Sequence, residues 1–499
     1  MSGKVILVGA GPGDPGLLTL RGREAIMSAE VVVYDRLVGP EILEIIPGGA
    51  ELINAGKASS RHLIPQEQIN RILLEKALEG KNVVRLKGGD PFLFGRGGEE
   101  LEALLGHGVD FEVVPGVPSA IAAPSYAGIP VTHRDICSSV HIITAHGRAN
   151  RPPDIKFDAL VKAGGTLVFL MGVTALGYIC DGLLGAGMRP DMPAAAVESG
   201  TLPAQRRIIS TLGALAGDAA EKKLGSPAVI IVGEVCSLSD DLCRFEKRPL
   251  FGRRIAVTRP RERAGTLSAR LRALGADVVD YPCIATVPIE PNGALDAAMG
   301  RVSEYEWLVF TSPAGVGAAL GRMFARGLDA RSLAGVHLAA IGSATARELG
   351  KFGLRADYVP EHYSARELGR GLAAIGRGKT LILRAREGSP YLTGALEAAG
   401  LAFDDVPVYD TVYESGNADA VRAMLAAGEL DAVTFTSAST VRGFVGSLSG
   451  ADFSGVLGVC IGEQTTQAAE EHGIKTIVAK NATIDELVGI IVEKFSEVR

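Results

Sequence analysis

Short apolar runs rich in β-branched residues recur along the whole chain and alternate with longer segments of helical periodicity. In the first half the runs lie at 5–8, 31–34, 82–86, 111–114, 140–144, 166–171 and 228–232. In the second half they lie at 255–258, 308–311, 336–341, 380–384, 432–436 and 456–461. Because alternating strands and helices are typical of α/β proteins, we expect an α/β fold with mainly parallel sheets.

A polar and charged stretch, SDDLCRFEKRPLFGRR at 239–254, interrupts this alternation. We therefore place the domain boundary there, with a first domain at 1–245, a linker at 246–252 and a second domain at 253–499.

The second domain contains an internal repeat. EWLVFTSPAGV matches DAVTFTSASTV, with Thr311 and Thr436 separated by 125 positions (436 minus 311), and the same offset relates Gly275 to Gly400. A chance match between common α/β segments is the alternative. The repeat predicts two similar α/β lobes with a ligand-binding cleft between them.

Composition excludes several classes of protein. The 499 residues include 51 Lys and Arg against 57 Asp and Glu, a net charge of −6, which lacks the basic excess of a nucleic-acid binder. No apolar run reaches the roughly 18 residues of a membrane span, and the N-terminus lacks a signal-peptide layout, so we expect a cytoplasmic protein. The six cysteines form no CxxC pair, and His133 and His146 fit no metal-ligand spacing, so we expect free thiols and no metal.

Two glycine-rich segments follow apolar runs in the first domain. GAGPGDPG at 9–16 fits the dinucleotide pattern, with Asp35 downstream as a ribose ligand, but Pro12 and Pro15 remove N–H donors that a pyrophosphate needs. RLKGGDPFLFGRGGEE at 85–100 adds a carboxylate at Asp90 and an apolar wall at Phe92 and Phe94. These features favour a ligand with an aromatic base and little negative charge, such as S-adenosyl-L-methionine. With PGVPSA at 115–120, we expect three turns to converge on one pocket.

The first domain resembles the uroporphyrinogen-III C-methyltransferases of the tetrapyrrole methylase class. The resemblance rests on VGAGPGDPGLLTL (8–20), VYDRLV (33–38), VVRLKGGDPFLFGRGGEE (83–100), GIPVTHR (128–134), LVFLMG (167–172) and SPAVIIVGEV (226–235). It implies a two-lobed homodimeric enzyme that moves two methyl groups from S-adenosyl-L-methionine to uroporphyrinogen III. The product would be precorrin-2, a precursor of sirohaem or cobalamin.

The resemblance also implies roles for single residues. Cofactor contacts would fall at Pro12, Gly88, Gly89, Asp90, Leu93, Pro118, Ser119, Met171 and Gly200. Pro118 stands where the family usually has Thr, so only the backbone turn is expected to persist there. Asp35 would act as the base and Lys57 as a proton donor; alternatively, Asp35 only ends a strand and Lys57 is a solvated loop cation.

The substrate of such an enzyme bears eight carboxylates, which need local cations on an acidic protein. We expect its carboxylates to meet some of the basic residues in or beside the motifs, namely Arg36, Arg61, Arg96 and Arg134, with Arg85 and Lys87 as further candidates. Solvated surface charge is the alternative for each of them.

The second domain resembles uroporphyrinogen-III synthase in the ordered set VTRP, LVFTSPAGV, AIGSATARELGKFG, LILRAREG, VPVYDTV, VTFTSAST and CIGEQTTQAAEEHG. The implied reaction is a lyase-type cyclisation of hydroxymethylbilane that uses no cofactor. Tyr409 would assist departure of the leaving group, and hydroxyls would bind carboxylates at Thr311, Ser312, Thr345, Thr436, Ser437 and Thr465. Helix capping is the alternative for the hydroxyls.

Together the two resemblances predict a bifunctional enzyme in which the product of one half is the substrate of the other. Two different interpretations remain open from sequence. One is a nicotinamide- or flavin-dependent oxidoreductase in the first half; the other is a non-catalytic, two-lobed ligand sensor in the second.

Overall fold

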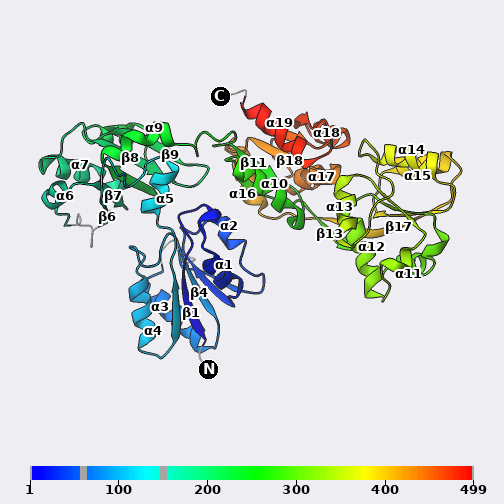
Figure 1. The fold of residues 1–499 in the computed structure, drawn as a ribbon, viewed down its shortest axis with the longest axis horizontal. Helices are drawn as coiled ribbons and strands as arrows, with labels where there is room; N and C mark the ends of the chain where they lie inside the picture. The colour runs from blue at the N-terminus through cyan, green and yellow to red at the C-terminus, as the bar shows by residue number, and fades with distance from the viewer. Residues whose placement is uncertain (1–2, 57–63, 147–153, 497–499) are drawn as a thin grey trace. The chain divides into compact units, whose positions relative to one another are not determined.

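The computed structural model describes residues 3–56, 64–146 and 154–496, without the side chains of 261–264, and divides into two compact units, Met1–Gly252 and Arg253–Arg499 (Figure 1). Each unit contains two five-stranded sheets, which confirms the predicted α/β class.

The first lobe of the first unit is built on a fully parallel sheet of order β3-β2-β4-β1-β5. Its strands are β1 (Lys4–Gly9), β2 (Val31–Tyr34), β3 (Glu51–Asn54), β4 (Val83–Lys87) and β5 (Asp110–Val114). Helices α1 (Leu20–Met27) and α2 (Pro40–Leu43) pack on one face, while α3 (Gln66–Leu78) and α4 (Gly97–Leu105) pack on the other (Figure 1). Because all five strands run the same way, their carboxyl ends meet at one edge of the sheet.

The second lobe carries a mixed sheet of order β6-β7-β10-β8-β9, in which only β6 and β7 run parallel. The strands are β6 (Val140–Thr144), β7 (Thr166–Leu170), β8 (Pro193–Glu198), β9 (Arg206–Thr211) and β10 (Ala228–Val232). Helices α6 (Phe157–Ala163), α7 (Leu176–Gly185) and α8 (Leu215–Glu221) cover one face, and α5 (Ser119–Tyr126) covers the other. This sheet departs from the mainly parallel pattern predicted for the chain, because β10 runs antiparallel to β7 and β8, and β8 and β9 form an antiparallel hairpin.

The segment 246–252, which was predicted to be a linker, lies within the first unit. After α9 (Ser239–Leu242), Glu246 accepts hydrogen bonds from Gln205 and Arg207, and Leu250 is fully buried. The described residues also form five short 3₁₀ helices: η1 (Pro15–Leu17), η2 (Val173–Ala175), η3 (Glu234–Leu238), η4 (Val302–Glu304) and η5 (Ala330–Leu333).

The second unit contains two sheets in which every pairing is parallel except that of β13 with β17. One sheet has the order β12-β11-β18-β19-β20, formed by β11 (Arg254–Val257), β12 (Asp277–Asp280), β18 (Ala432–Phe435), β19 (Leu457–Cys460) and β20 (Lys475–Val478). The other has the order β13-β17-β16-β14-β15, formed by β13 (Ile284–Pro288), β14 (Trp307–Phe310), β15 (His337–Ala340), β16 (Thr380–Ala385) and β17 (Phe403–Tyr413).

Ten helices of the second unit connect these strands. They are α10 (Arg261–Ala273), α11 (Gly293–Gly300), α12 (Pro313–Ala325), α13 (Ser343–Lys351), α14 (Ala365–Ile375), α15 (Pro390–Ala398), α16 (Ala418–Ala426), α17 (Ala438–Ser447), α18 (Glu463–Glu470) and α19 (Ile484–Ser496), within the described part of the chain.

The internal repeat relates strands of different sheets. The 125-residue offset pairs β14, which ends before Thr311, with β18, which ends before Thr436, and pairs β11 with β16. Since β14 and β16 share one sheet while β11 and β18 share the other, each sheet takes strands from both copies of the repeat. The second unit thus has the two predicted lobes, but neither lobe is formed by one copy of the sequence repeat alone.

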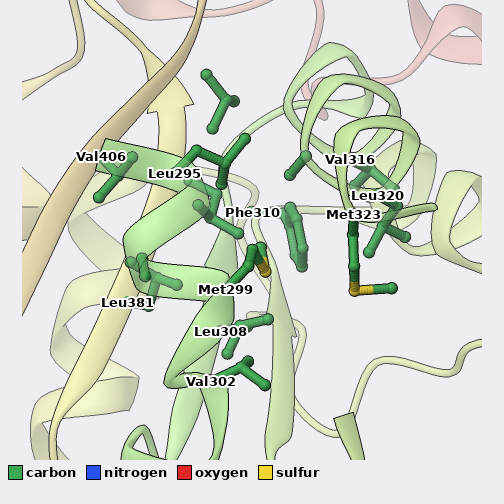
Figure 2. Close-up of a cluster of buried hydrophobic side chains, with 14 of the residues drawn as sticks. Leu295, Met299, Val302, Leu308, Phe310, Val316, Leu320, Met323, Leu381 and Val406 are labelled. Carbon is green, nitrogen blue, oxygen red and sulfur yellow. The ribbon is translucent and has the colours of Figure 1, made fainter. Parts of the chain in front are cut away.

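The core of the β14 sheet is a dense cluster of apolar side chains (Figure 2). Phe310 lies at its centre, fully buried between strands and helices α11 and α12, and its neighbours include Leu308, Met299, Leu320 and Met323. Close packing of this kind makes the lobe sensitive to the loss of one large side chain.

We expect Phe310→Ala to destabilise this lobe by about 3–5 kcal/mol, because it leaves a cavity, and Phe310→Leu to cost under about 1.5 kcal/mol. The single tryptophan of the chain, Trp307, lies in the same strand, so its fluorescence during urea unfolding reports on this lobe. An Ala variant with an unchanged unfolding midpoint would contradict the assignment of Phe310 to the core.

Candidate functional site

Three turns meet at the carboxyl edge of the first sheet, after β1, β4 and β5. Gly11 and Gly89 exchange two backbone hydrogen bonds of 2.7 and 3.2 Å. A Cβ on Gly116 would lie 2.2 Å from the carbonyl oxygen of Gly89 and 2.7 Å from the Cα of Gly9. The turns therefore touch through backbone atoms at distances that only glycine allows, as the sequence predicted for three converging turns.

The side chain of Asp90 holds two of these turns together. One carboxylate oxygen accepts from the backbone N–H groups of Phe92 and Leu93 at 2.8 and 3.1 Å, and the other accepts from Gly116 N at 3.0 Å. Its oxygens are thus engaged by the backbone, and Asp90 shapes the loop.

A fourth turn reaches the same place from the second lobe. A Cβ on Gly13 would lie 2.7 Å from a methyl carbon of Leu202, and one on Gly200 would lie 2.4 Å from the Cβ of Ala123 in α5. The backbone N–H of Asp14 donates to the hydroxyl of Thr201 at 3.2 Å. The fourth turn thus places Gly200 against α5, which begins at Ser119 after Pro118, and joins the loop that contains Pro12. The predicted residues Gly88, Gly89, Asp90 and Leu93 lie in the turn after β4, which contacts the turn at Gly11.

Met171 directly follows β7, in the same lobe as Gly200. It is half exposed and has a φ of 56°, a left-handed conformation that is uncommon for a side chain of this size. Backbone strain of this kind clusters at binding and catalytic sites.

Exposed apolar side chains border the converging turns. Phe92 is 59% exposed and Phe94 is 41% exposed, in the loop where the sequence predicted an apolar wall. Leu37, which the sequence analysis missed, is 54% exposed, and its Cβ would lie 2.6 Å from a Cβ on Gly88. Exposed apolar groups gathered beside glycine turns indicate a surface for a large, partly apolar ligand.

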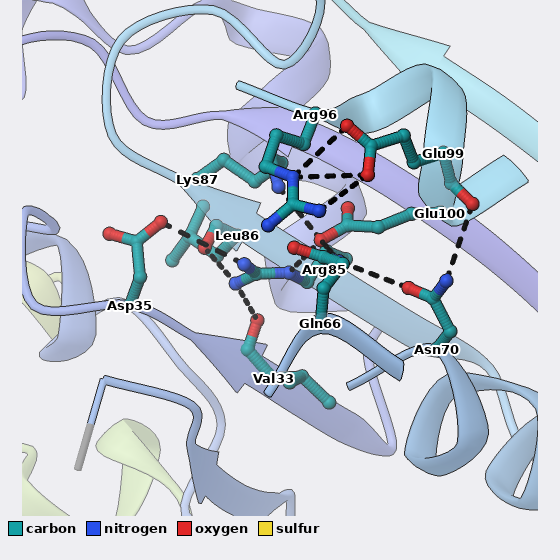
Figure 3. Close-up of polar contacts among 10 residues, drawn as sticks. All are labelled: Val33, Asp35, Gln66, Asn70, Arg85, Leu86, Lys87, Arg96, Glu99 and Glu100. Carbon is teal, nitrogen blue, oxygen red and sulfur yellow. Dashed lines mark hydrogen bonds and ion pairs between the residues drawn. The ribbon is translucent and has the colours of Figure 1, made fainter. Parts of the chain in front are cut away.

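The carboxylate of Asp35 lies at the end of β2, at the same edge of the sheet. One of its oxygens accepts from Leu37 N at 3.0 Å, and the other lies 3.9 Å from a terminal nitrogen of Arg85 (Figure 3). The Asp35 side chain is 28% exposed while that of Arg85 is 4% exposed. Asp35 is therefore an accessible carboxylate beside a buried cation.

Beneath Asp35, Glu100 of α4 holds two buried cations of β4. Its Oε1 accepts from Arg85 Nε at 3.1 Å, from Lys87 Nζ at 2.8 Å and from Gln66 Nε2 at 3.1 Å (Figure 3). Burial, and next the charge of Arg85, lower the pKa of Lys87. Arg85 and Lys87 are thus buried against Glu100, and little of either side chain is exposed to solvent, so their role as substrate-binding residues stays a prediction.

The other predicted cations are placed differently. Arg36 and Arg134 are exposed, and Arg96 precedes α4 with a φ of 59° and pairs with Glu99 at 3.0 Å. Lys57 and Arg61 lie outside the described residues.

In the second unit, the predicted hydroxyls lie after strands of both sheets. Ser312 accepts from Gly315 N at 3.0 Å and Ser437 from Thr440 N at 3.2 Å, so both serines cap helices, as the alternative interpretation proposed. Thr311 and Thr436 precede them and are half-buried.

Two of the predicted hydroxyl residues lie in the interior of the second unit. Thr345 is 1% exposed and Thr465 is 4% exposed, in the first turns of α13 and α18. Both side chains are therefore buried, and their role as ligands of substrate carboxylates stays a prediction.

Tyr409 of β17 meets Ser312 across the sheet. The two hydroxyl oxygens are 3.0 Å apart, and Tyr409 is 8% exposed. The hydroxyl of Tyr409, predicted to be catalytic, therefore lies within hydrogen-bond distance of the hydroxyl of Ser312, predicted to bind substrate, at the end of β14.

Two other kinds of site, metal centres and membrane-spanning helices, are absent from the described residues. No group of three His, Cys, Asp or Glu side chains there is arranged to hold a metal ion, and no helix there is long and apolar enough to cross a membrane. All six cysteines are free, which confirms the prediction of free thiols, and five of them are buried.

Comparisons with known proteins match both units. A family model described as Tetrapyrrole (Corrin/Porphyrin) Methylases matches residues 4–216, and one described as Uroporphyrinogen-III synthase HemD matches residues 265–489. The Porphyrin biosynthesis protein HemD of Ruminiclostridium josui is 49% identical over 493 residues, 98% of each chain.

Two further relatives match smaller shares of the chain. The Uroporphyrinogen-III C-methyltransferase of Bacillus subtilis is 40% identical over 70% of this chain and 72% of its own. The S-adenosyl-L-methionine-dependent uroporphyrinogen III methyltransferase of Methanosarcina barkeri is 52% identical over 48% of this chain and 94% of its own.

These matches confirm both resemblances found in the sequence and favour them over the oxidoreductase and sensor interpretations. The chain belongs to the tetrapyrrole methylases through its first unit and to the uroporphyrinogen-III synthases through its second, and it is a bifunctional enzyme of tetrapyrrole biosynthesis.

Proposed function

We propose that the second unit cyclises hydroxymethylbilane to uroporphyrinogen III and that the first unit methylates this product twice to give precorrin-2, with S-adenosyl-L-methionine as methyl donor. The observation that carries the proposal is the contact among the turns at Gly11, Gly89 and Gly116, which a fourth turn at Gly200 joins through the Gly13–Asp14 loop, beside the accessible carboxylate of Asp35. The proposal includes a homodimer formed through the first unit and a cytoplasmic location.

The residues at the converging turns suit this donor better than a dinucleotide. Pro12 and Pro15 leave few N–H donors for a pyrophosphate, and the carboxylate of Asp90 lies in the loop itself. Phe92, Phe94 and Leu37 provide apolar surface for a neutral ring system. S-adenosyl-L-methionine has no phosphate to bind and carries an adenine ring that can lie on this apolar surface.

When bound, S-adenosyl-L-methionine supplies an electrophilic methyl group. The chain aligns the nucleophilic pyrrole carbon with that methyl group and excludes water, which accounts for much of the rate in such transfers. The carboxylate of Asp35 then takes the proton that the methylated ring must lose. The nearby guanidinium of Arg85, held by Glu100, keeps a positive charge 3.9 Å from the Asp35 carboxylate.

In the second unit, the substrate must lose water and close into a ring. Tyr409 lies within hydrogen-bond distance of Ser312, whose hydroxyl also caps α12. We propose that the Tyr409 hydroxyl donates to the departing hydroxyl group of hydroxymethylbilane and that Ser312 fixes the position of the Tyr409 ring.

Gly116→Ala is expected to weaken binding of S-adenosyl-L-methionine by more than about tenfold, because its methyl group would collide with the Gly89 carbonyl and separate the turns. Isothermal titration calorimetry on the full-length protein measures this affinity. Gly98→Ala is the matched control, since a Cβ there meets nothing within 4 Å. Equal affinity in both variants would place the donor elsewhere.

Asp35→Asn should reduce methyl transfer by about 10²- to 10⁴-fold, because the amide cannot accept the proton, while donor affinity stays unchanged. The measurement is anaerobic turnover of uroporphyrinogen III with the methyl donor, followed by mass spectrometry of the product. Asp110→Asn, an exposed carboxylate of β5 in the same sheet, serves as control. Wild-type turnover by Asp35→Asn would remove Asp35 from catalysis.

Tyr409→Phe is expected to lower cyclisation of hydroxymethylbilane by at least about tenfold, because the leaving hydroxyl loses its donor. Without the methyl donor, the ratio of uroporphyrinogen III to the spontaneously formed isomer measures this step. Tyr413→Phe changes an exposed tyrosine of the same strand and should behave as wild type. A wild-type ratio in Tyr409→Phe would assign leaving-group departure to another residue.

A further inference from the structure

The turn that carries Gly200 adopts a strained backbone. Ser199 has a φ of 49° and Thr201 a φ of 75°, so two residues with side chains flank Gly200 in left-handed conformations. Such conformations persist only where surrounding contacts enforce them. The contacts that hold this turn therefore determine where Gly200 lies.

Thr201 links this turn to the first glycine loop. Its backbone N–H donates to Gln205 Oε1 at 2.9 Å, and its hydroxyl accepts from the backbone N–H of Asp14 at 3.2 Å. Thr201 is 2% exposed and Gln205 is 3% exposed. The hydrogen bond to Gln205 is thus buried and the one from Asp14 is partly buried, a setting in which the loss of a partner is costly.

Gln205 is in turn held by Glu246. The amide nitrogen of Gln205 donates to Glu246 Oε1 at 2.8 Å, while Glu246 Oε2 accepts from Arg207 Nε at 2.8 Å. Since a backbone N–H only donates and a carboxylate only accepts, the Gln205 side chain has one orientation that satisfies both neighbours.

A second route joins the same segment to the same loop. The hydroxyl of Tyr126 donates to Asp14 Oδ2 at 2.7 Å, and the Tyr126 ring packs against the ring of Phe245 with centroids 4.7 Å apart. Neighbouring residues of the segment that precedes the second unit, Phe245 and Glu246, thus reach the Asp14 loop by independent contacts.

We propose that Glu246, Gln205 and Thr201 are positioning residues that fix the Gly200 turn against the Pro12–Asp14 loop, so that the segment leading to the second unit is part of the methyl-donor site. The inference rests on the proposed binding of S-adenosyl-L-methionine at these turns. The segment at 246–252, which the sequence predicted to be a linker, thereby affects the affinity for the methyl donor through Glu246.

The test exchanges the two ends of the Gln205–Glu246 hydrogen bond in the full-length protein. Gln205→Glu places two carboxylates together in a buried setting, and we expect the dissociation constant for S-adenosyl-L-methionine to rise at least about tenfold. Adding Glu246→Gln places an amide N–H at position 246 opposite the carboxylate at position 205, so the hydrogen bond can form again. The dissociation constant for S-adenosyl-L-methionine should then return to within about threefold of wild type. Asp240→Asn is the control. It removes another partner of Arg207, the Asp240 carboxylate, whose side chain is 79% exposed, and it should leave the affinity for S-adenosyl-L-methionine unchanged.

Calorimetry gives the dissociation constant, methyl-transfer kinetics give the split between KM for the donor and kcat, and thermal unfolding reports general damage. A rise in the donor KM with Gln205→Glu that is reversed in the double variant, at similar unfolding temperatures, supports the proposal. Wild-type affinity in Gln205→Glu, or a double variant that regains stability but not affinity, overturns it. If the wild-type protein itself fails to bind S-adenosyl-L-methionine, the proposed function falls, and this inference with it.

Discussion

The close approach of three backbone turns at Gly9, Gly89 and Gly116 is the constraint on which the first unit depends. Neighbouring strands of a sheet lie roughly 4.8 Å apart, so turns that leave adjacent parallel strands and curl toward one another collide unless they lack side chains. Glycine removes the collision, and the Asp90 carboxylate then bonds one turn to the next. The exposed phenylalanines and Leu37 gain a fixed position only because the backbone beneath them is fixed.

Much of the fold could be predicted because buried strands have a simple local signal. AVIIV at 228–232 is buried at every position and forms β10, and the VVRL run likewise forms β4. Strand partners, in contrast, are set by contacts distant in sequence. Nothing within β8 and β9 distinguishes an antiparallel hairpin from a parallel pair. The repeat in the second unit gave no sign that each sheet would combine strands of both copies, β14 with β16 in one sheet and β11 with β18 in the other.

The site shows the same division between local and distant information. The glycine turns were predicted to converge because each follows its own strand. The burial of Arg85 and Lys87 was not predicted, since it depends on Glu100, which comes 15 and 13 positions later and returns to the strand only when α4 packs on the sheet. Likewise, the role of Gln205 depends on Glu246, 41 positions downstream, in a stretch whose composition resembles a linker.

Charge balance connects the buried network to substrate recognition. Taking two cations into the interior costs free energy that one carboxylate offsets only in part, and Glu100 is the fully buried carboxylate that both contact. The remaining positive charge lies nearest to Asp35, whose side chain is partly open to solvent at the edge of the sheet. The field at that edge is therefore less negative than the net charge of −6 suggests. On the proposed assignment of Asp35 as the catalytic base, the buried guanidinium of Arg85 offsets its negative charge, so that a polycarboxylate substrate meets less repulsion at this edge of the sheet.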